Sequence, residues 1–488
     1  MSISAALANA TSGLTVSSRL AELVSDNVAN ALTPGYVRKT AEVGSVVVNG
    51  QGGGAQIVGV SLANDPVLVA AARRGAAQSA ALSQEARTAT ALADAFGRYE
   101  TGDTLNTRMT AFETALTEAA NNPTSTSSQD SLLSAAKGVA DMLNQISTEN
   151  RRIRMDADAE IASQVGEINA ALKEISNLNR EIQMRSVQGG ETASLQDLRD
   201  RLVDDVSSQL PVRAQARPDG QIALYTAQGQ TLVDGSAAVL GFTPTGVITP
   251  DMSLAGGTLS GLTLSGQPIT LAPTPGLAGG DEGNLAALFK ARDEMVPEAD
   301  AQIDALASDL ITRLQSSAVD PTLLAGDAGL FTDGGVALTA PYTPGLAGRI
   351  EVNAAVDPAQ GGDLFRLRDG INALAPGLAG DASLFLAQSA ALSAVTTPPS
   401  GSGLTTSGGF GRFVADLTGL RDGQAAQAEQ TAARASATQD ILEQDRSSAS
   451  GVDTDAELQA LLAIEQAYAA NARVISVADR LIQSLLEI

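Results

Sequence analysis

The residues best placed to do chemistry are the carboxylates of a charged stretch, residues 195–209. That stretch contains Asp197, Asp200, Asp204 and Asp205, with Arg199 and Arg201 between them. Two neighbouring carboxylates can serve as a general acid and a general base. The stretch is also helix-like, and on a helix acidic and basic side chains three or four residues apart form ion pairs. The spacing favours ion pairs on a solvated helix face over catalysis.

Three absences limit the chemistry further, because the 488 residues include no histidine, no cysteine and no tryptophan. Without His and Cys, the usual zinc sites, Ser-His-Asp and Cys-His nucleophiles and disulfides are excluded. Loops rich in Asp and Gly, at Asp327, Asp333, Asp369 and Asp381, raise calcium binding as an alternative, but their spacing matches no known ligand loop. We therefore predict no catalytic residue, no cofactor and no metal site, and a protein that is not an enzyme.

The charge of the chain argues against two kinds of partner. The formal net charge is −24, and no block of Lys or Arg stands out, so nucleic acid and anionic membrane are excluded as partners. No apolar run reaches the length of a membrane span. The N-terminus has neither the basic region nor the continuous apolar region of a secretory signal, so we expect no cleaved signal peptide.

The elements that must organise the chain lie at its two ends. Residues 453–488 have the three-and-four spacing of a coiled-coil seam, on a helix about 54 Å long. The seam residues are Leu461, Ile464, Tyr468, Asn471, Ile475, Ala478, Ile482 and Leu485. Asp453 or Thr454 can cap the first turn. Asp455 and Glu457 suit the positive end of the helix.

The first thirty residues show the same spacing, at Ile3, Leu7, Ala10, Leu14, Ser17, Ala21, Val24 and Val28. Either the two terminal helices pair, or each docks separately on a core. We predict that they pair, within or between copies, through an assembly interface of Ile3, Leu7, Leu14, Val24, Val28, Leu461, Ile464, Tyr468, Ile475, Ile482 and Leu485. Because a lone seam in water favours fraying, we expect both helices to be partly disordered until neighbours bury them.

Between the ends, helical and strand-like periodicities alternate, which predicts an α+β multidomain fold. We expect a terminal coiled-coil unit from 1–40 and 450–488, an extended or hairpin connector at 41–65, a helical bundle from 66–210, 283–318 and 410–447, and a β-rich outer region from 211–282 and 319–409. A kink or restart is expected at Pro297. The string Pro-Gly-Leu-Ala-Gly recurs at Pro275, Pro344 and Pro376, and its unequal spacing indicates turns and not a structural repeat.

Motifs at both ends resemble those of the flagellar axial proteins, the subunits of rod, hook and hook–filament junction. The chain reads SDNVAN at 25–30 and TPGYVR at 33–38, then SGVD at 450–453 and EQAYAANARVIS at 465–476. The turn motif that carries the N-terminal resemblance consists of Asn27, Asn30, Pro34, Gly35 and Tyr36. LQDLRDRLVDDVS at 195–207 and GNLAALFKARDEMVP at 283–297 are similar to the helical domain of the junction proteins.

The resemblance implies a structural subunit of the junction between hook and filament, needed for filament assembly. Its implied partners are further copies of itself in a ring-like segment, the hook protein, the second junction protein on the filament side and a flagellar export chaperone. It also implies an extracellular place on the flagellum, reached through the flagellar type III apparatus. Another axial subunit, of hook or distal rod, is the alternative. An adhesin or enzyme with its activity in the β-rich region is a third class.

Overall fold

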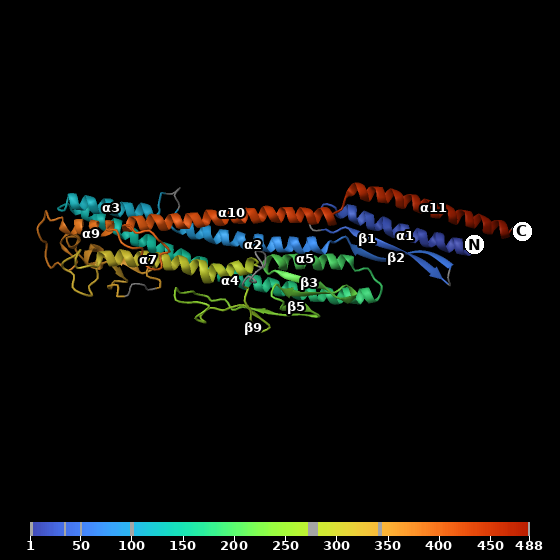
Figure 1. Cartoon of the computed structure of the whole chain (residues 1–488), viewed down its shortest axis with the longest axis horizontal. Helices are drawn as coiled ribbons and strands as arrows, with labels where there is room; N and C mark the ends of the chain where they lie inside the picture. The colour runs from blue at the N-terminus through green and yellow to red at the C-terminus, as the bar shows by residue number, and fades with distance from the viewer. Residues whose placement is uncertain are drawn as a thin grey trace.

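The computed structural model describes residues 3–33, 36–48, 51–97, 102–271, 282–339 and 344–486. Long helices run side by side along an elongated body, and the two chain ends lie together at one end of it (Figure 1). The helices are α1 Ile3–Asn30, α2 Pro66–Ala95, α3 Leu105–Asn121, α4 Thr126–Val187, α5 Ala193–Gln209, α6 Asn284–Lys290, α7 Val296–Leu314, α8 Arg366–Asp369, α9 Ser383–Ser393, α10 Phe410–Ser450 and α11 Thr454–Leu486.

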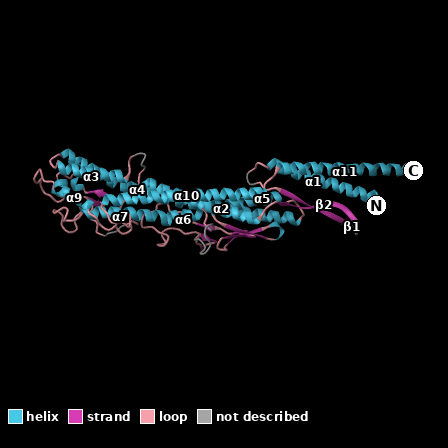
Figure 2. Cartoon of the chain, turned by 45° about the horizontal axis from the view of Figure 1, so that its top comes forward, coloured by secondary structure: helices cyan, strands magenta, loops and turns pink. Residues whose placement is uncertain are grey.

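All strand pairs in the described part of the chain are antiparallel, and all strands except the long β1 and β2 are short (Figure 2). They are β1 Lys39–Val48, β2 Gln51–Leu62, β3 Val212–Ala216, β4 Ile222–Thr226, β5 Thr231–Asp234, β6 Ser236–Ala237, β7 Leu240–Gly241, β8 Thr263–Leu264, β9 Gln267–Pro268, β10 Phe331–Asp333 and β11 Ile350–Val352. β1 and β2 form a hairpin, β3 to β6 and β7 to β9 form two small sheets, and β10 pairs with β11. The predicted α+β class is confirmed.

Helix α4 runs through the whole body and contributes to both of its large apolar clusters. Its apolar residues recur every three or four positions over its whole length. Its first half, including Leu132 and Ile146, joins an apolar cluster with α3, α7, the start of α10 and residues 319–409. Its second half, including Ile161 and Ile175, joins another cluster with α5, α6 and the sheets of β3 to β9. One helix therefore holds two cores in line.

Helix α10 returns along α2 from the distal core to the chain ends. The contact is made by small side chains, since Ala89 and Ala93 of α2 and Ala425 of α10 are buried together. Asp453 then caps the next helix, accepting hydrogen bonds from the amides of Asp455 and Ala456 at 3.0 and 3.1 Å. Of the two expected capping residues, Asp453 is the one used.

The expected β-rich character of 319–409 is wrong. Its described residues, 319–339 and 344–409, contain the three-residue strands β10 and β11, the helices α8 and α9, two short 3₁₀ helices, and otherwise loops and turns. Its Asp, Gly and Pro residues make turns that pack on the distal core without extended strands between them. Helix α9 buries Leu384, Phe385 and Leu392, a helical spacing. By contrast, 211–282 does carry strands β3 to β9.

The expected irregularity at Pro297 takes the form of a π-helical turn, Ala291–Met295, between α6 and α7. The amide of Val296, the first residue of α7, bonds to the carbonyl of Ala291. Pro297, which has no N–H, follows in the first turn of α7. The helix thereby continues from one core to the other with a local widening.

Candidate assembly interface

The charged stretch on α5 forms a network of ion pairs. Asp197 pairs with Arg201 one turn later, at 2.5 Å, as the spacing predicts. Asp204 instead receives Arg73 of α2 at 2.6 Å and Arg446 of α10 at 2.7 Å. Asp197 and Arg199 are buried, so the expectation of a solvated face is wrong for these two residues. Asp204 fastens α5 to α2 and α10.

The Asp-containing loops are likewise occupied by internal bonds. Asp333 pairs with Arg349 at 2.8 Å, and Asp369 pairs with Arg368 at 2.7 Å. Asp327 accepts from Asn372 at 2.6 Å. Within the described ranges, no group of three or more acidic side chains is arranged to hold a metal ion.

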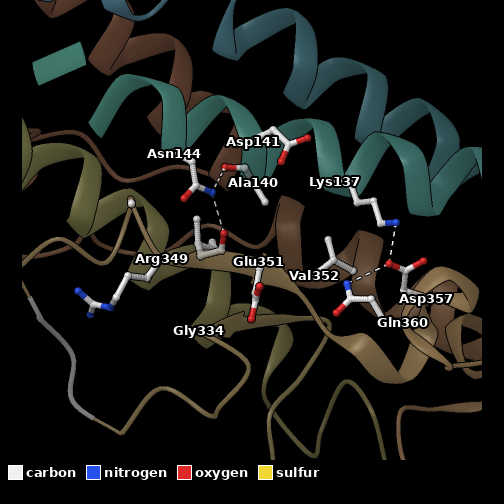
Figure 3. A pocket seen from close by; sticks show the side chains of 12 residues that line it. Lys137, Ala140, Asp141, Asn144, Gly334, Arg349, Glu351, Val352, Asp357 and Gln360 are labelled. Atoms are coloured by element: carbon white, nitrogen blue, oxygen red, sulfur yellow. Dashed lines mark hydrogen bonds and ion pairs between the residues drawn. The ribbon is translucent and has the colours of Figure 1, made fainter. Parts of the chain in front are cut away.

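A polar groove of about 620 Å³ lies between α4 and β11 (Figure 3). Lys137 in its wall pairs with Asp357 at 2.8 Å, and Asn144 donates to the carbonyl of Ile350 at 2.8 Å. These two contacts hold the loop region against α4. Over the described residues, no helix combines the length and apolarity that a membrane span needs.

The two terminal helices do pack along each other, and α1 lies between α11 and the β1–β2 hairpin (Figures 1 and 2). The approach is close at Gly13, where an added Cβ would stand 2.6 Å from the side-chain nitrogen of Asn471. On the other side of α1, the hydroxyl of Ser12 accepts the amide of Ala55 from β2 at 3.2 Å. We call α1, β1, β2 and α11 the terminal unit.

The predicted interface residues fall into three groups by burial. Val24 is buried, and the half-buried ones are Ile3, Leu7, Leu14, Val28, Leu461, Ile464 and Ile475. Tyr468 and Ile482 remain 49% and 37% exposed. The side chain of Leu485 lies outside the described residues. The seam is therefore turned toward the partner helix but is only partly covered within one chain, and its role between copies stays a prediction.

A second apolar row on α11 was not singled out from the sequence. Leu462, Val477 and Leu481 are 59%, 53% and 51% exposed, and Leu458 and Val474 are exposed as well. The i, i+4 spacing of Leu458 with Leu462, and of Val477 with Leu481, was the signal that could have revealed it. These five exposed residues lie in two groups, Leu458 with Leu462 and Val474 with Val477 and Leu481, about 18 Å apart along the helix. We call them together the outer row of α11.

The turn motif folds around one buried amide, Asn27. Its Nδ2 donates to the carbonyl of Lys39 at 2.9 Å, and its Oδ1 accepts the amide of Lys39 at 3.0 Å. The hydroxyl of Tyr36 donates to the same Oδ1 at 3.0 Å. The side chain of Asn27 thus acts like a strand partner for β1 and fixes how the chain leaves α1. Asn30 ends α1 with a bond to the carbonyl of Asp26, whereas Pro34 and Gly35 lie outside the described residues.

Glu457 of α11 joins this motif from the other end of the chain. Its carboxylate is buried and accepts Arg38 Nε at 2.6 Å and Asn27 Nδ2 at 3.3 Å. Lys39 reaches the body, donating to the hydroxyl of Ser194 at 3.1 Å. Burial, followed by the nearby carboxylates of Asp26, Asp197 and Glu457, raises the pKa of Tyr36 to about 12. We call Asn27, Tyr36, Arg38, Lys39, Ser194 and Glu457 the polar neck.

Fold and site define a class: an elongated, mostly helical protein whose two ends pair in a separate unit carrying an exposed apolar row. Residues 89–329 match the family model described as the flagellar hook-associated protein FlgK helical domain. Residues 443–488 match the flagellar basal body rod FlgEFG protein C-terminal. These matches confirm the resemblance to the flagellar axial proteins and, for the helical domain, to flagellar hook-associated protein 1.

Individual relatives share part of the chain. Flagellar hook-associated protein 1 of Salmonella typhimurium is 30% identical over 251 residues, 48% of this chain and 44% of that protein. Its namesake in Bacillus subtilis is 28% identical over 136 residues, 28% of this chain and 27% of that protein. The alignments span less than half of these relatives' lengths. The flagellar hook junction protein FlgK from Burkholderia pseudomallei aligns over 56% of this chain and 47% of that one, with a TM-score of 0.43 and 23% identity.

Proposed function

We propose that the chain is a structural subunit at the junction between flagellar hook and filament, with no catalytic activity. The observation that carries the proposal is the match of residues 89–329, which form most of the body, to the helical domain of a hook-associated protein. The terminal unit supports it, since an exposed apolar row on a paired terminal helix suits contact with further copies.

The partners follow from that role. Copies of the chain would assemble through the predicted interface and the outer row of α11, on the hook protein at one side and the second junction protein at the other. Before assembly, a flagellar export chaperone would cover the same apolar residues. Export through the flagellar type III apparatus to the extracellular flagellum suits a chain without cysteine, because no disulfide can hold it folded in transit.

Electron microscopy of a clean deletion strain, with flagellin measured in the medium, tests the proposal. We expect completed hooks without filaments and flagellin released from the cells. Missing or shortened hooks would place the chain in hook or distal rod instead, the alternative that the match of 443–488 to rod proteins keeps in view. Normal filaments would refute an axial role.

A further inference from the structure

Hydrogen bonds of the polar neck join the terminal unit to the body. Lys39 bonds to Ser194 of α5 at 3.1 Å, and the amide of Arg38 bonds to the carbonyl of Ser450, the last residue of α10, at 2.9 Å. In both ribbon views the terminal unit projects beyond the end of the body (Figures 1 and 2). Val37 is buried at this contact, but among the described residues none of the terminal unit belongs to an apolar cluster of the body. Hydrogen bonds therefore carry much of the attachment.

Two grooves flank this contact. One, of about 890 Å³, separates α1 and β2 from the turn between α4 and α5, with Arg19 and Val58 on one wall and Gly190 on the other. The second, of about 530 Å³, lies between the turn after α1 and the α10–α11 connection, near Tyr36 and Arg446. The two grooves leave the packing around the neck incomplete on both sides.

The hydrogen bonds of the neck can fix the angle between the terminal unit and the body. They join residues from the N-terminal part of the chain to residues from its C-terminal part. Asn27 shapes the exit from α1, Arg38 is bonded through its backbone to α10, and Glu457 on α11 binds both side chains. A buried carboxylate that loses such partners is costly, so α11 is held in the one position where Glu457 meets Arg38 and Asn27. Bonds to a charged group are also the stronger and more directional ones.

We propose that Asn27, Arg38 and Glu457 are positioning residues that set the angle between the terminal unit and the body, and that this lock closes only when α11 is in place. This angle sets the direction in which the outer row of α11 points relative to the body, and so which neighbouring copy it can contact. That consequence for assembly rests on the proposed junction role, whereas the angle itself is a property of the single chain.

The absence of cysteine makes the angle measurable, because two introduced cysteines are the only labelling sites. Ala437 on α10 and Ala469 on α11 are exposed and lie about 40 Å apart along the two helices at 1.5 Å per residue. Spin labels at Ala437→Cys and Ala469→Cys, read by double electron–electron resonance on the purified full chain, report the distribution of that distance.

We expect a narrow distribution in the parent, and one at least twofold broader in Glu457→Ala and in Asn27→Ala. Glu457→Gln, which keeps an oxygen to accept from Arg38, should restore most of the narrowness. Glu465→Ala, at an exposed position of the same helix, is the matched control and should leave the distribution unchanged. An unbroadened, unshifted distribution in Glu457→Ala overturns the proposal.

Circular dichroism separates loss of the lock from loss of the helix. If Glu457→Ala loses helix content, Arg38→Ala takes its place, since the Arg38 side chain is 40% exposed and its removal disturbs little packing. Broadening in Arg38→Ala supports the lock, and a parent-like width overturns it. Normal filaments in the deletion strain would refute the junction role and leave this measurement unaffected.

Discussion

The outer row of α11 gives the sharpest prediction, because the single chain leaves it half exposed. We consider replacing Leu462, Val477 and Leu481 together by glutamate. Each side chain is 51–59% exposed, so about half of its apolar surface is still available for burial. Full burial of such a side chain contributes about 1.5–3 kcal/mol, so the unused half corresponds to about 1 kcal/mol each.

For the three residues together, about 3 kcal/mol of assembly free energy is at stake for each copy. At 1.4 kcal/mol per tenfold, that is about a hundredfold weaker association between copies. The single chain should lose little, because glutamate is a good helix former and exposed substitutions usually change stability by less than about 0.5 kcal/mol each.

Two measurements on the triple variant test this reasoning. Circular dichroism of the purified chain should show a thermal transition close to the parent's. In the deletion strain, expression of the variant should leave hooks without filaments and flagellin in the medium. Gln427, Gln430 and Gln444, exposed on α10, provide a control that adds the same three charges as glutamates and should support filaments. Parent-like filaments with the α11 variant would refute the outer row as an interface.

Three further predictions concern stability. Burial raises the pKa of Asp300 to about 6; the folded state then binds the proton more tightly than the unfolded chain, so stability falls as pH rises from about 4 to 6. Asp300→Asn should flatten that slope and gain up to about 3 kcal/mol at pH 7.5 in denaturant unfolding. Arg292→Ala strands the buried partner Asp158 and should cost about 3–5 kcal/mol, with part recovered by adding Asp158→Asn. Amide exchange should be faster across α1 and α11 than across α4; equal, strong protection would contradict early fraying of the ends.

How much the sequence predicts depends on whether the signal is local. The terminal helices and the cap at Asp453 follow from spacing and capping chemistry within a few residues, and both appear in the structure. The seam was also assigned to the correct face of α11, since Ala478 is buried while Leu481 stays exposed. Periodicity gives the direction of a helix face without any knowledge of its partner.

Features set by distant partners were not predictable in the same way. From the sequence, Glu457 is a negative charge that the positive end of the helix dipole stabilises. In the structure it is also bonded to Arg38 and Asn27, which come from the opposite end of the chain. The string Pro-Gly-Leu-Ala-Gly is a second example, because identical local sequences have different burial. Leu346, after Pro344, is buried in the distal core, whereas Leu378, after Pro376, is 81% exposed. The copy at Pro275 lies outside the described residues.

The terminal unit is separate from the apolar cores of the body, and this separation determines which property each kind of substitution should affect. Among the described residues, none in the four apolar clusters of the body comes from α1, β1, β2 or α11. The body can therefore keep its own fold while the terminal unit moves or waits for neighbours. It follows that core substitutions such as Arg292→Ala should change unfolding, neck substitutions should change geometry, and outer-row substitutions should change assembly. If every such substitution changed unfolding, neck geometry and assembly together, the chain would have to be held by one continuous apolar core. The structure instead has separate cores.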